Sequence, residues 1–351
     1  MDWVVNAAVF FLTAAGLITL FSLNRQLFFQ QLLWAGMLIF VIFIFSLVDW
    51  RPLINYRSLI FGIYFLIIGL LVLTYFFAPT IRSARSWLVW GSFQFQPAEL
   101  AKLALIIVYG YFFARRHQGI AHWRNLFLPF LYFLLPAALV LLQPDLGTVL
   151  ILFGLWAGFL LLSGLRFRHL LFGTIIFSLL GFWAWQNFLA DYQKERIIGA
   201  FRPGYDPLGV NYSVIQSKIA IGSAGFWGKG YGRGSQAQLG FLPEATTDFI
   251  FAAFVEEWGF AGGFLIIAAF MLLTLRLTQI GLQSRHNFGA FVALGTALLF
   301  LLHFILNVGF NLGLMPVIGV PFPFFSYGGS NLLTNGILIG ILQSVVIRKP
   351  F

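Results

Sequence analysis

The segment FLPEATTDFIF, residues 241–251, places the carboxylate of Asp248 where a glycine-rich polar stretch meets a long apolar run. An ionisable group at the edge of a membrane span is costly to place there and usually serves a function. A carboxylate at such a boundary can do chemistry, which is the interpretation favoured here, or it can gate a pathway through the protein. The structural alternative is an N-cap cluster, because Asp248 with Thr246 and Thr247 resembles the start of the helix that follows.

Glu99 and Lys102 are a second candidate pair. They stand three residues apart in an apolar stretch, so on a helix their side chains share one face and reach each other. Charged residues paired inside a membrane span are expected to be functional. The same spacing also fits an ion pair whose only effect is to neutralise the two charges.

Glu256 and Glu257 follow Asp248 in the same apolar run, and Glu256 repeats the helical face of Asp248 eight residues later. An acidic stripe of this kind could hold a divalent cation such as magnesium through oxygen ligands. The alternative is that one glutamate pairs with a basic group while the other lines a cavity or reaches the interface. Asp145, in QPDLGT, is explained by turn chemistry.

Histidine and cysteine chemistry are not expected. The chain has no cysteine, and its spacing of histidines matches no zinc motif. His303 stands alone in an apolar stretch, and the other histidines fall near predicted cytoplasmic loops. No cofactor is therefore predicted with certainty, and a divalent cation is the one candidate.

The composition identifies the class of protein that must position these residues. Hydrophobic residues make up 60% of the chain and charged residues only 9%, far from the averages of soluble domains. These values predict a polytopic membrane protein. The net charge of +10 does not indicate nucleic-acid binding, because no basic patch with interleaved aromatic residues occurs outside short inter-helix loops.

Apolar runs long enough to cross a bilayer predict an all-α fold with about ten transmembrane helices. The expected spans are 3–23, 31–48, 58–77, 100–114, 125–143, 147–164, 169–189, 249–275, 288–309 and 327–347. The fourth span is short unless it begins within FQFQPAEL. The first has no basic segment before it, so it is interpreted as a retained helix and not as a cleaved signal peptide.

The distribution of basic residues predicts the orientation. Loops after even-numbered spans are rich in arginine, as at Arg57, Arg115, Arg116, Arg276 and Arg285, whereas the opposite short loops hold only Arg25, Arg82 and Arg85. Arginine-rich loops face the cytoplasm. Both termini are therefore expected to be cytoplasmic, and residues 190–248 are expected to form a large extracytoplasmic loop between the seventh and eighth spans.

That loop is too small and too rich in glycine to bury a core of its own. We therefore predict a single membrane domain over residues 1–351, with the loop folded on the bundle. The glycines of IGSAGFWGKGYGRG allow a close backbone approach to a bulky ligand, or they belong to a plain flexible loop. The prolines of GLMPVIGVPFPFFSYGGS indicate a non-helical return at membrane depth, which is tolerated beside a cavity.

Several long motifs resemble the bacterial SEDS family. They are DPLGVNYSVIQSKIAIGSAGFWGKGYGRGSQ, FLPEATTDFIFAAFVEEWG and NVGFNLGLMPVIGVPFPFFSYGGS, together with FQFQPAELAK at 93–102 and QPDLGT at 143–148. They cover most of the chain in order, and QSKIAIGS and GKG resemble the elongation (RodA-like) members most. The chain departs from the family pattern at Ala224, Thr246 and Trp258.

The resemblance implies a peptidoglycan glycosyltransferase that polymerises lipid II at the outer face of the bacterial cytoplasmic membrane, during cell elongation and rod-shape maintenance. Inversion at a polyprenyl-pyrophosphate donor needs one base and positive charge for the leaving group. The resemblance implies that Asp248 is the base. It also implies that Glu99 and Lys102 shape the outer cavity or hold the pyrophosphate through Lys102.

Four basic residues of the large loop are further candidates for holding the pyrophosphate, although any one of them can equally be an ordinary solvated charge. These are Arg196, Arg202, Lys218 and Lys229.

The expected partners are lipid II, membrane lipid, a class B penicillin-binding protein with one span, and other proteins of the elongation complex, but no nucleic acid. The alternative function is a transporter, or flippase, of the lipid-linked precursor. It is disfavoured because the halves of the chain show no inverted repeat and the candidate charges gather toward the outer face. A scaffold that only recruits other wall enzymes would make the cavity charges dispensable.

Overall fold

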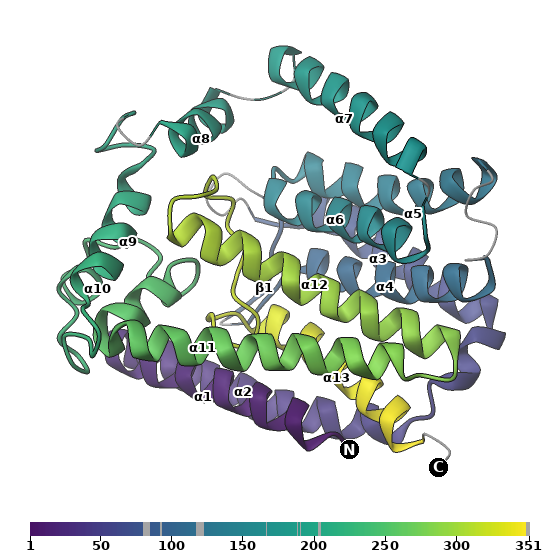
Figure 1. The fold of residues 1–351 in the computed structure, drawn as a ribbon, viewed down its shortest axis with the longest axis horizontal. Coiled ribbons are helices and arrows are strands. Elements are labelled where there is room, and N and C mark those ends of the chain that lie inside the picture. The colour runs from purple at the N-terminus through teal and green to yellow at the C-terminus, as the bar shows by residue number, and fades with distance from the viewer. Residues whose placement is uncertain are drawn as a thin grey trace.

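The long helices of this chain form a bundle (Figure 1). The computed structural model describes residues 1–79, 85–91, 93–116, 123–165, 167–187, 189, 191–202 and 205–348. Arg82, one of the basic residues predicted on the outer side, lies outside these ranges. The elements are α1 (Trp3–Leu23), α2 (Arg25–Leu47), a 3-10 turn η1 (Arg51–Asn55), α3 (Arg57–Phe77), β1 (Leu88–Trp90), β2 (Phe93–Phe95), α4 (Pro97–Arg116), α5 (Trp123–Leu142), α6 (Leu146–Leu162), α7 (Phe167–Asn187), α8 (Asp191–Phe201), α9 (Tyr212–Ser223), α10 (Ser235–Gln238), α11 (Ile250–Leu282), α12 (Asn287–Asn311) and α13 (Gly329–Ile347).

The predicted spans correspond to helices α1 to α7 and α11 to α13. Within the described ranges, α1, α2, α3, α4, α11, α12 and α13 are long and apolar enough to cross a membrane. The segments Leu126–Leu142 of α5 and Leu146–Leu162 of α6 are apolar but shorter. The prediction of an all-α polytopic membrane protein is therefore confirmed.

Helix boundaries differ from the prediction where polar residues find partners. α2 begins at Arg25, not at 31, because the side chain of Asn24 accepts hydrogen bonds from the backbone N–H of Gln26 and Leu27, at 3.0 and 3.1 Å. α11 continues beyond 275 to Leu282, and in this extension Arg276 Nε donates to Asp2 Oδ2 at 2.8 Å. An apolar run alone could not indicate either partner.

The two chain ends lie at the same end of the bundle (Figure 1). The backbone N–H of Asp2 donates to Gln343 Oε1 at 2.6 Å, which joins the start of α1 to α13. This arrangement agrees with an even number of spans. Because Arg276 near the far end of α11 also meets Asp2, the beginning of α11 lies at the opposite end of the bundle.

Helix α4 lies at the centre of the bundle. It is the most deeply buried of the apolar helices, and it packs against α3, α5, α6, α12 and α13. Its apolar side chains therefore meet other helices instead of lipid. A helix in this position can carry charged side chains only where neighbouring helices supply partners.

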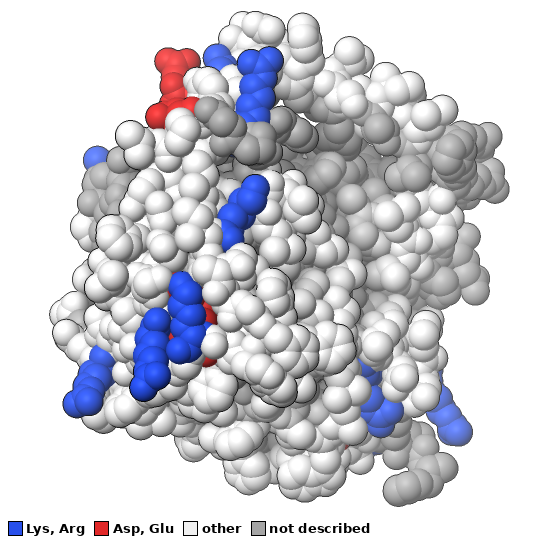
Figure 2. Space-filling view, turned by 60° about the vertical axis from the view of Figure 1, so that its left-hand side comes forward, with Lys and Arg blue, Asp and Glu red and all other residues white. Residues whose placement is uncertain are grey.

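In the part of the predicted outer loop that the structure describes, the chain forms helices α8, α9 and α10. α9 packs against α11 and α12, so this part of the loop lies on the bundle as expected. Figure 2 shows a surface on this side that is mostly uncharged, with scattered Lys and Arg side chains. Such a surface agrees with the low charge content of the chain.

Helix α11 is interrupted at Gly259, where φ is 72°. The backbone of the glycine-rich segment GFWGKG forms hydrogen bonds with the residues on both sides of this interruption. The N–H groups of Lys229 and Gly230 donate to the carbonyls of Glu256 and Glu257, at 2.9 and 3.1 Å. In return, the N–H groups of Phe260 and Ala261 donate to residues 225 and 226, each at 3.0 Å. The segment therefore supplies hydrogen-bond partners for two carbonyls and two N–H groups that would bond to each other in an unbroken helix.

Gly228 makes this close approach possible. Its φ is +83°, and a Cβ atom there would lie 2.2 Å from the carbonyl oxygen of Glu257. A side chain at this position would meet backbone, which has little room to move. The glycine pattern thus serves contact between two parts of the chain.

Replacing Gly228 with alanine should lower the free energy of unfolding by about 1–3 kcal/mol, because it adds backbone strain and a steric clash. Thermal unfolding in detergent measures the change. Gly222→Ala is the matched control, since Gly222 has no heavy atom within 4 Å of the added Cβ. Equal melting temperatures for the two variants would contradict the account of the interruption.

Candidate functional site

A cavity of about 520 Å³ lies at the end of the bundle where α4, α6 and α11 begin. Its wall includes three carboxylate residues and one arginine: Glu99, Asp145, Asp248 and Arg196. Ser86, Trp87, Thr247, Tyr327 and Asn331 complete much of its polar lining. The structure thus brings the two main candidates of the sequence, Asp248 and Glu99, to a single cavity.

Asp248 lies on a tight turn that precedes α11. The turn closes when the N–H groups of Thr247 and Phe249 donate to the carbonyl of Glu244, each at 3.1 Å. The N–H of Tyr327 donates to the carbonyl of Thr246, also at 3.1 Å. These bonds attach the turn to the segment that follows α12, so the half-buried Asp248 is held against a second wall.

The N-cap interpretation of Asp248 does not match the helix boundary. α11 begins at Ile250, its N-cap residue is Phe249, and this end has no side-chain capping hydrogen bond. Thr247 Oγ1 instead donates to Glu244 Oε2 at 3.1 Å. The alternative of an N-cap cluster therefore does not hold, because the turn at Glu244 places the threonine and aspartate side chains before the helix proper.

The predicted contact between Glu99 and Lys102 is present. Lys102 Nζ donates to Glu99 Oε1 at 2.7 Å, and both side chains are almost completely buried. Asn331 Nδ2 donates to the other carboxylate oxygen of Glu99 at 2.8 Å. Glu99 lines the cavity, whereas Lys102 lies behind it and is not among the lining residues.

His303 completes this group, contrary to the expectation that it stands alone in an apolar helix. Its Nε2 lies 3.1 Å from Lys102 Nζ, and its Nδ1 lies 3.0 Å from the carbonyl oxygen of Pro321. A carbonyl can only accept a hydrogen bond and an ammonium group can only donate one. The geometry therefore fits a neutral imidazole that carries its proton on Nδ1.

The sequence does contain a signal for His303, although it matches no zinc motif. His303, Asn307 and Asn311 are spaced four residues apart, which places them on one face of α12. All three side chains are buried. Their partners come from other helices and loops, so only the fold identifies them.

Asp145 is the N-cap of α6, as turn chemistry predicted. Its side chain accepts hydrogen bonds from the N–H and hydroxyl of Thr148, at 3.0 and 2.8 Å, and from Gln96 Nε2 at 3.0 Å. Burial in the cavity wall raises the pKa of the Asp145 carboxyl, and the hydrogen bonds from Thr148 act in the opposite direction. Its oxygens are thus engaged in structural contacts.

The four candidate cations of the large loop lie in different places. Arg196 lines the cavity, and its guanidinium donates to the carbonyl of Val317 at 3.4 Å. Lys218 lines a smaller neighbouring pocket, and Arg202 follows the end of α8. Lys229 pairs with Glu256 at 2.7 Å and does not line either pocket.

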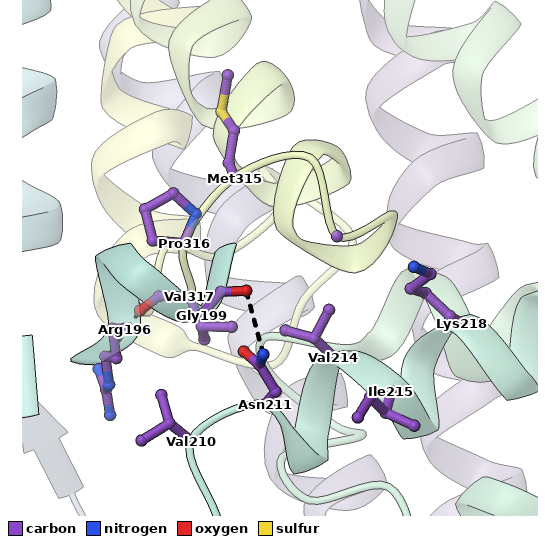
Figure 3. A pocket seen from close by; sticks show the side chains of 11 residues that line it. Arg196, Gly199, Val210, Asn211, Val214, Ile215, Lys218, Met315, Pro316 and Val317 are labelled. Atoms are coloured by element: carbon purple, nitrogen blue, oxygen red, sulfur yellow. Dashed lines mark hydrogen bonds between the residues drawn. The ribbon is translucent and has the colours of Figure 1, made fainter. Parts of the chain in front are cut away.

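Figure 3 shows the smaller pocket, with Arg196 and Lys218 on opposite sides. Asn211 Nδ2 donates to the carbonyl of Gly199 at 3.1 Å and to that of Arg202 at 3.2 Å. These bonds satisfy carbonyls at the C-terminal end of α8. Asn211 therefore fixes the helix that carries Arg196 next to the larger cavity.

Glu256 and Glu257 do not form a cation site with each other. Glu256 pairs with Lys229 and accepts a further hydrogen bond from the N–H of Gln236, at 2.9 Å. Glu257 accepts hydrogen bonds from the hydroxyl of Ser22 and from Gln238 Nε2. Over the part of the chain that the structure describes, no group of three or more His, Cys, Asp or Glu side chains is arranged to hold a metal.

Comparison with known proteins shows which family the chain belongs to. Residues 2–349 match the family described as cell cycle proteins, FtsW/RodA/SpoVE. The peptidoglycan glycosyltransferase MrdB of Escherichia coli K12 is 38% identical over 285 residues, which cover 81% of this chain and 76% of MrdB. Stage V sporulation protein E of Bacillus subtilis is 36% identical over 317 residues, 90% of this chain and 86% of that protein.

Two solved structures share the fold. One is a chain from a peptidoglycan synthase complex that coordinates polymerization and crosslinking, with a TM-score of 0.83, 33% identity, and 98% of this chain and 97% of that chain covered. The other is the rod shape determining protein RodA of Thermus thermophilus, with a TM-score of 0.73, 28% identity, and 100% and 98% covered. Together with the family match across nearly the whole sequence, these similarities establish that the chain belongs to the FtsW/RodA/SpoVE family of cell cycle proteins.

Proposed function

We infer that this chain is a peptidoglycan glycosyltransferase that polymerises lipid II into glycan strands during cell elongation and rod-shape maintenance. The observation that carries the inference is the cavity in which Asp248 and Glu99 face the same space. Relatives that carry the name peptidoglycan glycosyltransferase support the assignment. The enzyme inverts the anomeric centre of a polyprenyl-pyrophosphate-linked donor.

Asp248 acts as the general base in this proposal. It takes the proton from the 4-hydroxyl of the acceptor GlcNAc while the oxygen attacks the anomeric carbon of the donor and the pyrophosphate leaves. Asp248 suits this role because it lines the cavity and is only half-buried, so a substrate hydroxyl can approach its carboxylate. Of the other two cavity carboxylates, Glu99 pairs with Lys102 and Asn331, and Asp145 caps α6. A base must reach the hydroxyl directly or through one water.

Arg196 is the proposed cation for the leaving pyrophosphate, since it lines the cavity and guanidinium binds phosphate oxygens in pairs. Lys218, in the adjoining pocket, is a second proposed contact for a long lipid-linked substrate. Glu99 and Lys102 shape the cavity wall in this scheme, because Lys102 lies behind Glu99. Arg202 and Lys229 were also predicted to bind substrate, and their positions give that role no support.

The proposed binding position for a divalent cation such as magnesium is the cavity. Three carboxylates line the cavity without forming a cluster of ligands in the described ranges. If a cation bound there, a carboxylate of the cavity wall and the substrate pyrophosphate would hold it, and it would neutralise negative charge on the leaving group.

In this proposal, the chain spans the bacterial cytoplasmic membrane with the cavity facing outward. The cavity lies at the opposite end of α11 from the contact between Arg276 and Asp2. Arginine-rich loops predict that the end with the termini is cytoplasmic. The proposed partner is a class B penicillin-binding protein, in agreement with the similarity to a chain of a peptidoglycan synthase complex. Other proteins of the elongation complex and membrane lipid are further proposed contacts.

Asp248→Asn and Asp248→Ala should reduce glycan polymerisation from purified lipid II by about 10²- to 10⁴-fold, the usual contribution of a general base. The assay uses the detergent-solubilised chain with its transpeptidase partner. Asp191→Asn, which changes an exposed carboxylate of α8, is the control for lost negative charge.

Full polymerising activity of folded Asp248 variants would disprove the base assignment. If the wild-type chain made no polymer but moved labelled lipid II across liposomes, the transporter would become the better interpretation.

Lys102→Met should lower the free energy of unfolding by about 3–5 kcal/mol, because it leaves the charge of Glu99 buried without its partner. The double change Glu99→Gln with Lys102→Met removes both charges and should restore most of that loss. If the pair shapes the active cavity, the folded double variant should still polymerise at least about tenfold more slowly than wild type. A folded double variant with wild-type activity would show that Glu99 and Lys102 only neutralise each other's charge and have no role in catalysis.

Arg196→Gln should lower kcat/KM for lipid II by about 10- to 100-fold, since a hydrogen bond to a charged group contributes roughly 1.5–3 kcal/mol. Arg202→Gln removes an equal charge from the region just after the same helix and should have a much smaller effect. Steady-state kinetics at several lipid II concentrations separates the two. Equal losses for both variants would indicate general electrostatic attraction instead of a specific contact.

A further inference from the structure

One face of α12 carries three buried polar side chains, those of His303, Asn307 and Asn311. Polar groups in an apolar helix are costly unless they find partners within the protein. Each of the three contacts a wall of the cavity described above. His303 meets Lys102 and Pro321, whereas the two asparagines meet the backbone around Asp248.

The side chain of Asn311 inserts into the first turn of α11. Its Nδ2 donates to the carbonyl of Asp248 at 3.0 Å, and its Oδ1 accepts from the N–H of Ala252 at 3.3 Å. In a continuous helix these two backbone groups would bond to each other. The next N–H along, that of Ala253, makes the ordinary bond to Phe249 at 3.1 Å. The side-chain amide of Asn311 therefore replaces one backbone hydrogen bond of the helix by bonding to both of its groups.

Asn307 links the carbonyl of Asp248 to the segment after α12, which forms the facing wall of the cavity. Its Nδ2 donates to the carbonyl of Asp248 at 3.1 Å and to that of Val320 at 2.8 Å. Asn311 Nδ2 in turn donates to the backbone carbonyl of Asn307 at 2.9 Å. Gly319 lies next to Asp248, since a Cβ atom at Gly319 would stand 3.7 Å from Asp248 Oδ2. The backbone of Asp248 is thus held from two directions.

We propose that Asn307 and Asn311 are positioning residues that fix the carboxylate of Asp248 in the cavity by binding its backbone carbonyl. The proposal rests on the assignment of Asp248 as the general base. With the carbonyl held by two amide donors, the backbone at Asp248 cannot rotate without breaking both bonds. The Cα–Cβ bond that carries the carboxylate therefore has a fixed direction before substrate arrives.

Positioning of this kind affects the chemical step more than binding. A base must lie within about 2.6–3.2 Å of the hydroxyl oxygen, and a displacement of roughly 1 Å can cost about 100-fold in rate. Substrate contacts made elsewhere in the cavity, such as those of Arg196, do not depend on the asparagines. Loss of the hydrogen bonds should therefore lower kcat while KM changes little.

The test compares Asn311→Leu and Asn311→Asp with wild type in steady-state polymerisation of lipid II by the complex with its transpeptidase. Asn311→Asp is nearly isosteric and keeps the acceptor for Ala252, but it removes the donor to Asp248. Thr296→Val is the matched control, because Thr296 is buried on the same helix and its hydroxyl donates only within the helix, to Val292 at 2.8 Å. Melting temperatures are measured in parallel.

We expect kcat to fall by about 10- to 100-fold for both Asn311 variants, with KM within about threefold of wild type. Thr296→Val should stay within about twofold of wild type. Wild-type kcat in either folded Asn311 variant would overturn the proposal. A loss of activity that merely follows the fall in melting temperature, with the same trend for Thr296→Val, would also overturn it and assign the asparagines a structural role.

Asp248→Asn is measured in the same series, so that two failures can be told apart. If Asp248→Asn is inactive and Asn311→Asp is fully active, the base assignment stands and the positioning role falls. If Asp248→Asn is active, the base assignment falls, and any effect of Asn311 must be exerted on another group.

Discussion

The hydrogen bonds between α12 and the first turn of α11 connect the parts of the candidate site. Asn307 and Asn311 both donate to the carbonyl of Asp248, and Asn307 also donates to the segment after α12 through Val320. One turn earlier along α12, His303 joins Lys102 to Pro321 in that segment. Because lipid and apolar side chains offer no alternative partners, these polar groups fit only one arrangement of the helices.

The interruption of α11 at Gly259 fixes the same region from the opposite side. The segment GFWGKG bonds to the backbone on both sides of the interruption, and the Lys229–Glu256 ion pair attaches it by a side chain. The first part of α11, from Ile250 to the interruption, is therefore held by the outer loop as well as by α12. Asp248 lies just before this short segment, so its backbone has little freedom to move, which suits a base that must meet a lipid-tethered substrate at a defined depth.

Much of the fold could be predicted from the sequence, because a bilayer requires long apolar helices and these are visible as apolar runs. The Glu99–Lys102 contact was also predictable, since two residues three apart on a helix are neighbours whatever surrounds them. The start of α2 and the end of α11 were misplaced, because an apolar run does not show the hydrogen bonds that Asn24 and Arg276 make. Partners that are distant in sequence were invisible, as for Lys229 with Glu256 and for His303 with Lys102.

The most direct measurement of the central claim is a structure of the complex with a non-hydrolysable donor and an acceptor glycan bound. The distance from each of the three cavity carboxylates to the acceptor 4-hydroxyl decides which of them is the base. The account predicts that a carboxylate oxygen of Asp248 lies about 2.6–3.2 Å from the hydroxyl oxygen, directly or through one water. A hydroxyl bound instead by Glu99 or Asp145, with Asp248 out of reach, would contradict it.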